Sequence, residues 1–198
     1  MKCLYWNIRG LANSPSNLAL KRLVNNNRPD FIFIAEPWIP FHKFSNRWLH
    51  RLGYKLFSVN QKDDLLPNLW GFCSLNLNPT LLSITDQAIS LTISTNNISF
   101  GLSVIYASTC YLKRRNLWNN LTTLQANHNI PWSFIGDFNT VIGSHEYRGS
   151  FSPARIPMTD FSQWTDNNEL FHPLLVAPSS HGPMEGEVRP TQKKDLIG

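Results

Sequence analysis

Trp132-Ser133-Phe134-Ile135, followed directly by Gly136-Asp137-Phe138-Asn139, is an apolar run that ends in a glycine and then presents an acid and an amide. Residues two apart on an extended chain share a face, so Asp137 and Asn139 point the same way at the strand end. Together they can hold a water molecule that is bound to a metal or a phosphate. The alternative is an ordinary turn after a core strand, because Gly, Asp and Asn are common turn residues.

Two further segments have the same design. Residues 4–10 form an apolar run that contains Asn7, and residues 30–38 form another that closes on Glu36. Such runs are typical of strands buried on both faces, whose polar end residues stand at the rim of the sheet. We therefore expect Asn7 and Glu36 to stand at the rim with the acid and amide described above. The alternatives are a solvated strand end for Glu36 and a turn or cap residue for Asn7.

Four phrases, in this order, carry a resemblance to a known family. They are WNIRG (6–10), FIAEPW (33–38), VIYAST (104–109) and GDFN (136–139). In combination they resemble the endonuclease/exonuclease/phosphatase superfamily, which includes deoxyribonuclease I and the apurinic endonucleases. The resemblance is strongest to the endonuclease domain of plant non-LTR (LINE-type) retrotransposons, where GDFN is followed by an E-x-R-G segment, here 146–149. It runs from residue 1 to about residue 172.

The resemblance implies hydrolysis of phosphodiesters with a divalent cation, Mg²⁺ or Mn²⁺. It implies that Glu36 binds the metal, with Asn7 in or beside its coordination shell, since Mg²⁺ prefers hard oxygen ligands. Asp137 would position or deprotonate the attacking water, and Asn139 would orient the scissile phosphate. Tyr106, at the end of a neighbouring strand, would approach that phosphate. The alternative for Tyr106 is a rim tyrosine with packing value only.

The composition is that of one globular domain with a polyanionic partner. The chain has 198 residues, 42% of them hydrophobic, a formal net charge of +5 and a pI near 9.3. This length buries one substantial core, and the positive charge favours a polyanion, which the resemblance specifies as DNA. Candidate nucleic-acid contacts are Arg9 and the cluster Lys113-Arg114-Arg115. A solvated helix start is the alternative for the cluster.

Cysteine usage and hydropathy bear on the cellular compartment. Cys3, Cys73 and Cys110 form neither a disulfide framework nor a CxxC metal pattern, so we expect reduced, buried thiols. Apolar stretches stay shorter than a membrane span, and Met1 leads into a strand instead of a signal region. We expect a soluble, intracellular protein without a membrane partner. The resemblance implies a nuclear location and, in intact relatives, a reverse transcriptase domain on the same chain.

Periodicity and turn residues predict an alternation of sheet and helix. Ser14-Pro15 predicts a helix start, with Ser14 as the cap and Pro15 at the first position. The mixture indicates an α/β fold of two packed sheets with helices outside, the family's deoxyribonuclease I-like α/β sandwich, incomplete at the C-terminus. The later strands should be antiparallel. We expect helices ending near residue 27 and at 41–51, 112–127 and 157–168, and strands at 2–7, 31–36, 54–60, 68–76, 81–87, 90–94 and 98–106.

The C-terminal end departs from the family pattern. Intact members carry a T-W-S-N strand, a further Asp and a final Ser-Asp-His segment, which are missing from this sequence. His145, His172 and His181 stand in other contexts, and we expect them to be surface or loop histidines. We expect one endonuclease/exonuclease/phosphatase domain at 1–180 and an out-of-frame, disordered tail at 181–198, which is polar and rich in Gly and Pro.

A shift of the reading frame near Ser180 is our hypothesis for this tail. If the third base of each codon is read with the first two of the next, permissible codons spell T-W-S-N and the continuation expected of the family. Loss of the last strands would uncover sheet edges, remove the His–Asp end of the site and impair the activity. Two other functions stay open: a phosphatase of the same superfamily acting on inositol phosphate or a sphingolipid, and a non-catalytic nucleic-acid-binding remnant.

Overall fold

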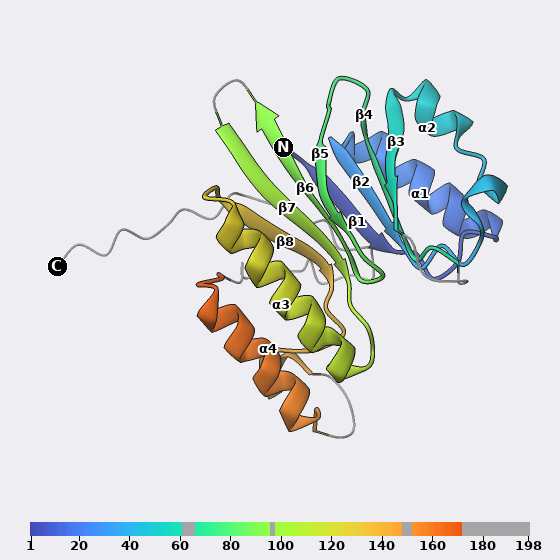
Figure 1. Cartoon of the computed structure of the whole chain (residues 1–198). Helices are drawn as coiled ribbons and strands as arrows, with labels where there is room; N and C mark the ends of the chain where they lie inside the picture. The colour runs from blue at the N-terminus through green and yellow to red at the C-terminus, as the bar shows by residue number, and fades with distance from the viewer. Residues whose placement is uncertain (61–65, 96–97, 148–151, 172–198) are drawn as a thin grey trace.

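In the computed structural model, which describes residues 1–60, 66–95, 98–147 and 152–171, two four-stranded sheets pack between two layers of helices (Figure 1). β1 pairs with β2 in parallel, as β7 does with β8, and the other pairs are antiparallel. The expected two-sheet α/β sandwich is confirmed. The first sheet has the order β1 (Cys3–Asn7), β2 (Phe31–Ala35), β4 (Leu69–Ser74), β3 (Tyr54–Val59), and the second β5 (Thr80–Ile84), β6 (Ala88–Thr95), β7 (Ile98–Tyr106), β8 (Trp132–Asp137).

Helices cover the outer faces of both sheets. The prediction of one helix at 41–51 is wrong, because the segment forms two short pieces. Phe44 lies between them with an extended backbone, and its ring packs on Trp70 and Phe72, so burial of this ring interrupts the helix. The helical elements are α1 (Ser14–Asn27), η1 (Phe41–Lys43), α2 (Arg47–Arg51), α3 (Tyr111–Asn127), η2 (Ser144–Glu146) and α4 (Arg155–Asn167).

The start of α1 differs from the prediction by one residue. The cap is Asn13 and not Ser14, since the Asn13 side chain accepts a hydrogen bond from the Ser16 backbone N–H at 2.8 Å. Asn and Ser are equally good at this position, and the amide oxygen of Asn13 reaches the donor three residues on. Pro15 then falls within the first turn, where its missing N–H has no cost.

Three apolar clusters hold the layers together. The central cluster joins Phe33 of β2 to Leu91 of β6 and Val104 of β7, and so fills the space between the sheets. A second cluster packs Leu20 and Val24 of α1 against the first sheet. A third packs α3 and α4 against the outer face of the second sheet. β2 therefore lies at the centre of the molecule, and each of its five residues is 0% exposed.

The prediction that all three apolar runs are buried on both faces holds for β2 and is wrong for β8. In β8 only Trp132 is buried, and the residues from Ser133 to Asp137 are half-buried. Within the described ranges β8 pairs with β7 alone and forms the edge of its sheet. β1 is also an edge strand, and it passes from buried Cys3 to half-buried Asn7.

The second sheet also corrects two strand boundaries. The strand predicted at 81–87 ends at Ile84, and the next begins at Ala88 instead of residue 90. The cause is Thr85, whose Oγ1 accepts hydrogen bonds from the backbone N–H groups of Gln87 (3.2 Å) and Ala88 (3.0 Å). A hydroxyl used in this way closes a turn and competes with strand pairing.

The three cysteines are free thiols, and two of them are buried as predicted. Burial raises the pKa of Cys3 to about 12. The prediction is wrong for Cys110, which is exposed at the start of α3. There the backbone N–H groups of Lys113 and Leu112 lower the pKa of its thiol. Across the described residues, the helices are too short or too polar to cross a membrane.

Candidate active site

Four strand ends bring the predicted polar residues together at one edge of the sandwich. Asn7 ends β1 opposite Ala35 in the parallel β1–β2 register, so the next residue, Glu36, emerges beside it. In the second sheet, Tyr106 ends β7 opposite Asp137 at the end of β8. Because each pair of strands is parallel, their carboxyl ends meet at the same rim.

A hydrogen-bond network joins these ends. The Asn7 Nδ2 atom donates to Glu36 Oε1 at 3.0 Å and to Asp137 Oδ2 at 3.1 Å. The Tyr106 hydroxyl donates to the same Glu36 Oε1 at 2.7 Å. One amide therefore bridges two carboxylates that come from different sheets and lie about a hundred residues apart in sequence. The resulting cluster is partly buried, which strengthens its electrostatic interactions.

The chemistry of this cluster fits a divalent cation with a preference for oxygen ligands. Asn7 Oδ1 is buried and accepts no hydrogen bond from the described residues, although its own amide nitrogen contacts both carboxylates. A buried acceptor without a donor is costly unless something else binds it. Mg²⁺ is commonly held by one or two carboxylates together with water and substrate oxygens. The described ranges hold no group of three or more His, Cys, Asp and Glu side chains that could bind a metal ion. A Mg²⁺ site with one or two carboxylates does not require such a group.

Backbone conformation at the rim is strained. Glu36, Asn139 and Arg9 have φ values of 51°, 49° and 48°, in the left-handed region that side chains with a Cβ rarely adopt. Gly136 has φ 140°, and a Cβ there would fall on the carbonyl oxygen of Ile105 in β7. Strained residues of this kind gather at functional sites, where surrounding contacts hold them. At this rim the strained residues include Glu36 and Asn139 themselves and Gly136, which directly precedes Asp137.

Asp137 and Asn139 are positioned by the backbone around β7. The Asn139 N–H donates to Asp137 Oδ1 at 3.0 Å, while Asn139 Nδ2 donates to the carbonyl oxygen of Ala107 at 2.6 Å. The Ala107 N–H in turn donates to the Asp137 carbonyl oxygen at 2.8 Å. The chain leaves the strand conformation after Asp137, since β8 ends there and Asn139 has a left-handed φ, so the extended two-residue spacing does not continue to Asn139. Both residues are instead tied to Ala107, which follows Tyr106.

Tyr5 belongs to this cluster and was missed in the sequence. Its hydroxyl accepts a hydrogen bond from the Asp137 backbone N–H at 3.2 Å. Burial, followed by the charge of Asp137, raises the pKa of Tyr5, and burial and Glu36 likewise raise the pKa of Tyr106. Both hydroxyls are therefore neutral near pH 7. Tyr5 stands two residues before Asn7 on the same strand, so the alternation of β1 was a signal that could have identified it.

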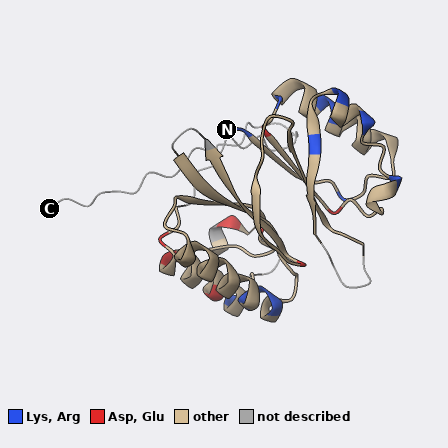
Figure 2. Cartoon of the chain, turned by 45° about the horizontal axis from the view of Figure 1, so that its top comes forward, with Lys and Arg blue, Asp and Glu red and all other residues tan. Residues whose placement is uncertain are grey.

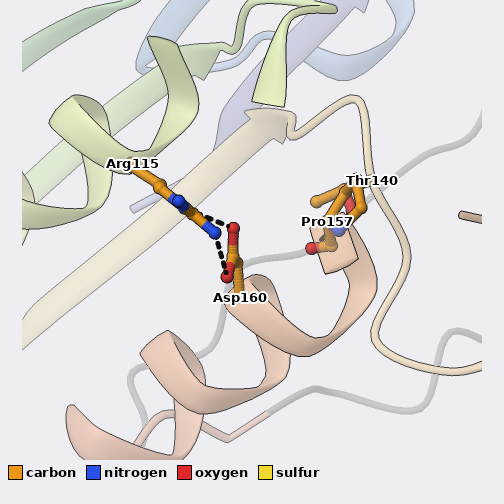
Figure 3. A network of polar contacts seen from close by, with 4 residues as sticks. All are labelled: Arg115, Thr140, Pro157 and Asp160. Atoms are coloured by element: carbon orange, nitrogen blue, oxygen red, sulfur yellow. Dashed lines mark hydrogen bonds and ion pairs between the residues drawn. The ribbon is translucent and has the colours of Figure 1, made fainter. Parts of the chain in front are cut away.

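The four candidate nucleic-acid contacts have different surroundings. Arg9 is exposed. Its positive charge lowers the pKa of the Tyr106 hydroxyl, against the larger effects that raise it, so Arg9 lies near the cluster. Lys113 is exposed near the start of α3. Arg114 is buried and donates to the carbonyl oxygens of the segment before α3, at 2.7 and 3.0 Å. Arg115 forms an ion pair with Asp160 of α4 at 2.7 Å (Figure 3).

Positive charge is concentrated on one side of the molecule. Figure 2 shows most of the Lys and Arg residues on the side of α1 and α2, and most of the Asp and Glu residues on the side of α3 and α4. The cations on α1 and α2 include exposed Lys21, Arg22, Arg47 and Arg51. Within the described ranges the single ion pair is the one between α3 and α4, so these four cations have no acidic partner there.

A cavity of about 890 Å³ opens next to the cluster. Asn7, Asp137 and Asn139 lie along its wall, together with residues such as Tyr147 and Met158. Because Asn7 comes from the first sheet and Asp137 from the second, a ligand in this cavity would contact residues of both sheets. Some predicted features lie outside the described residues. These are the side chain of His145, the residues His172 and His181, and the Arg148-Gly149 half of the E-x-R-G segment.

Comparison with known proteins agrees with this architecture. The model of the endonuclease/exonuclease/phosphatase family matches residues 4–173. A search of curated proteins gave no match. Solved structures with a similar fold include an AP endonuclease from Archaeoglobus fulgidus (TM-score 0.62, 16% identity, 84% of this chain and 70% of that one) and the endonuclease domain of TRAS1, a telomere-specific non-LTR retrotransposon (0.61, 14%, 84% and 71%).

The human Nocturnin catalytic domain is similar over a smaller share (TM-score 0.50, 20% identity, 70% of this chain). The chain covers 64% of that domain and about 70% of the other two structures. At these identities the similarity establishes the fold, so the chemistry has to be argued from the residues of this chain.

Proposed function

Since the chain belongs to the endonuclease/exonuclease/phosphatase family, we propose that it is a divalent-metal-dependent DNA endonuclease of the plant LINE retrotransposon type. The observation that carries the proposal is the bridge from Asn7 Nδ2 to both Glu36 and Asp137, because it holds two carboxylates beside one amide whose buried oxygen has no donor among the described residues. Hard oxygen ligands in that arrangement suit Mg²⁺ or Mn²⁺. TRAS1, whose endonuclease domain has a similar fold, is a retrotransposon.

Each residue of the cluster has a distinct task in this proposal. Glu36 and Asn7 Oδ1 would hold the cation, which when bound would neutralise charge on the phosphate oxygens. Asp137 accepts a proton from the attacking water or orients it, with Tyr5 and Asn139 fixing its position. Asn139, whose Nδ2 donates to the Ala107 carbonyl oxygen, would orient the scissile phosphate.

Tyr106 acts in its neutral form. Its raised pKa keeps the proton on the hydroxyl, which donates to Glu36 and holds that carboxylate toward the site. A neutral donor at this place can also contact a phosphate oxygen. Positioning of this kind favours the in-line geometry that phosphodiester hydrolysis requires.

The DNA partner is proposed from charge. We propose Arg9 and Lys113 as contacts to phosphates, because both are exposed, whereas Arg114 and Arg115 are engaged with the protein itself. The concentration of cations on the side of α1 and α2 supports a polyanionic substrate. A nuclear location and a reverse transcriptase domain on the same chain in intact relatives are further parts of the proposal.

The tail at 181–198 lies outside the described residues and stays a prediction. We propose that its out-of-frame sequence impairs the endonuclease, since the family's His–Asp pair would be missing from the site. Sequencing of the gene beside an intact copy tests this. A single-base insertion or deletion near Ser180 is expected, and an uninterrupted frame in both copies would overturn it.

Magnesium-dependent nicking of supercoiled plasmid tests the endonuclease. Asp137→Asn and Glu36→Gln should each lower the nicking rate by roughly 10²–10⁴, since each removes a group that acts on the water or the metal. Asp166→Asn is the matched control, because that carboxylate is exposed in the last turn of α4 and takes no part in the network. Chelation with EDTA should abolish the reaction. Detectable nicking at equal rates by the unaltered chain and by Asp137→Asn would refute the assignment.

A version whose reading frame is shifted at Ser180 separates the remaining outcomes. Nicking by this version alone would locate the defect in the tail and support the site. Salt-dependent DNA binding without nicking by either version would favour the binding remnant. Phosphate release from an inositol phosphate or a phosphorylated sphingolipid, lost in Asp137→Asn, would favour the phosphatase.

A further inference from the structure

Trp38 is a large aromatic residue left in solvent next to the candidate metal ligand. Its side chain is 61% exposed, and it stands two residues after Glu36. Its φ of 54° places it in the left-handed region, which is unfavourable for a bulky residue. Exposure and strain in one residue both cost free energy, and such costs are typical of residues that contact a ligand.

The position of Trp38 is held by the backbone of the β1 rim. The Gly10 N–H donates to the Glu36 carbonyl oxygen at 2.8 Å, and the Leu11 N–H donates to the Pro37 carbonyl oxygen at 2.9 Å. The indole lies against Gly10, where a Cβ would approach Trp38 Cε3 to 3.2 Å. Gly10, at φ 108°, therefore allows the contact, and the remaining indole surface stays open.

The chain places the Trp38 backbone close to Glu36, the candidate metal ligand. Two residues of extended chain span at most about 7 Å, so the Trp38 backbone lies within that distance of Glu36. Neighbouring bases in a nucleic-acid strand are separated by a similar or smaller distance. Arg9, directly before Gly10, adds an exposed cation on the same rim. An aromatic surface beside a cation is the combination that binds unpaired nucleotides.

We propose that Trp38 stacks on the base of a nucleotide adjacent to the scissile phosphate, so that the enzyme prefers DNA in which that base is unpaired. This inference rests on the proposed function, because the phosphate is placed at Glu36 and Asp137. Stacking contacts the flat face of a base, which all four bases share, and not the edge that distinguishes them. The subsite should therefore discriminate unpaired from paired DNA and should show little preference for sequence.

DNA binding, measured under conditions that prevent cleavage, tests the inference. Fluorescence anisotropy in EDTA would give the Kd of a labelled single-stranded oligonucleotide and of the same sequence as a duplex. Trp38→Ala should weaken single-strand binding roughly tenfold to a hundredfold and duplex binding much less, while Trp38→Phe keeps most of the affinity. Ile98→Ala is the control, because Ile98 is 65% exposed at the opposite end of β7 and should change neither Kd.

Trp38→Leu separates stacking from apolar bulk. Leucine keeps an apolar side chain without a flat face, so it should behave like Trp38→Ala. Single-strand affinity unchanged in Trp38→Leu would overturn the proposal, as would equal losses in Trp38→Ala and Ile98→Ala. Quenching of 2-aminopurine in the oligonucleotide by the unaltered chain and by Trp38→Phe, and not by Trp38→Leu, would support it directly.

The two proposals fail in different ways. If Asp137→Asn leaves nicking unchanged but Trp38→Leu weakens single-strand binding, the endonuclease site is wrong and the base-binding subsite stands. If Asp137→Asn abolishes nicking and Trp38→Leu changes neither Kd nor quenching, the endonuclease stands and the subsite is refuted.

Discussion

The two carboxylates of the site follow strands of similar sequence and very different burial. Glu36 directly follows β2, which ends in Ile34-Ala35, and Asp137 is the last residue of β8, which ends in Ile135-Gly136-Asp137, so each acid comes after an isoleucine and a small residue. β2 is 0% exposed throughout and pairs on both sides, whereas β8 is half-buried and, within the described ranges, pairs with β7 alone.

This difference shows that one local pattern can serve two structural roles. Glu36, the candidate metal ligand, is attached to the most buried strand of the molecule. Asp137, the candidate group for the water, is held on an edge strand by Tyr5, Asn7 and Ala107, with the cavity beside it. The rim of β2 should therefore tolerate little change in packing, and the rim of β8 should depend on a few specific contacts.

The largest expected effect comes from the close approach of β8 to β7. Gly136→Ala should destabilise the protein by roughly 3–5 kcal/mol, because a Cβ would collide with the Ile105 backbone and φ 140° is unfavourable for alanine. Gly53→Ala is the control, since a Cβ there meets open space and only its φ of 86° opposes the change, which should cost about 1 kcal/mol. Urea denaturation of both variants measures the difference, and equal losses would contradict the close approach.

The matched isoleucines test the comparison of the two strands directly. Ile34→Ala should cost roughly 3–4 kcal/mol, because it leaves a cavity in a core with no exposed surface. Ile135→Ala should cost about half as much, since Ile135 is only half-buried and water can reach the vacated space. The free energies of unfolding of the two variants decide the point. A larger loss for Ile135→Ala would mean that β8 is buried as deeply as β2.

Alkaline pH tests the contact between β1 and β8. Because the pKa of Tyr5 is raised in the folded protein, unfolded Tyr5 loses its proton first, above its ordinary pKa of 10. Stability contributed by this residue is complete below pH 10 and should fall by up to about 1.4 kcal/mol per pH unit above it. Denaturation at pH 9, 10 and 11 should show a shallower fall for Tyr5→Phe. Tyr106→Phe should show a difference in the same direction, because burial and Glu36 raise the pKa of that hydroxyl as well.

The smallest effect is expected at the link between α3 and α4. Arg115→Ala removes the exposed ion pair with Asp160 (Figure 3), and solvent and salt screen such pairs. The unfolding midpoint should hardly change, and the change should vanish at high salt. Asp160→Asn is the paired variant, and a thermodynamic cycle with both substitutions isolates the interaction. A large coupling that persists in high salt would show that α4 depends on this contact.

Much of the fold followed from local patterns. Continuous apolar runs located β1, β2 and β8, and helical periodicity located α1, α3 and α4, because the spacing of apolar residues reports which face of an element is buried. Polar residues that end apolar runs also indicated Asn7, Glu36 and Asp137 as rim residues. These predictions depend on neighbours within a few positions in the chain.

Other features depend on contacts between distant segments. Tyr5 reaches Asp137 across 132 positions, Arg114 is withdrawn from solvent by carbonyl groups, and Phe44 interrupts a helix to pack on Trp70. The alternation of β1 could have indicated Tyr5, but the neighbouring sequence does not predict its partner, nor the contacts of Arg114 and Phe44. The residue types and periodicity of the chain were enough to establish the sandwich and its rim of acids and amides. Which of those side chains touch, and which strand lies at the edge, was settled by packing, because the free energy of burial depends on every element that closes around a residue.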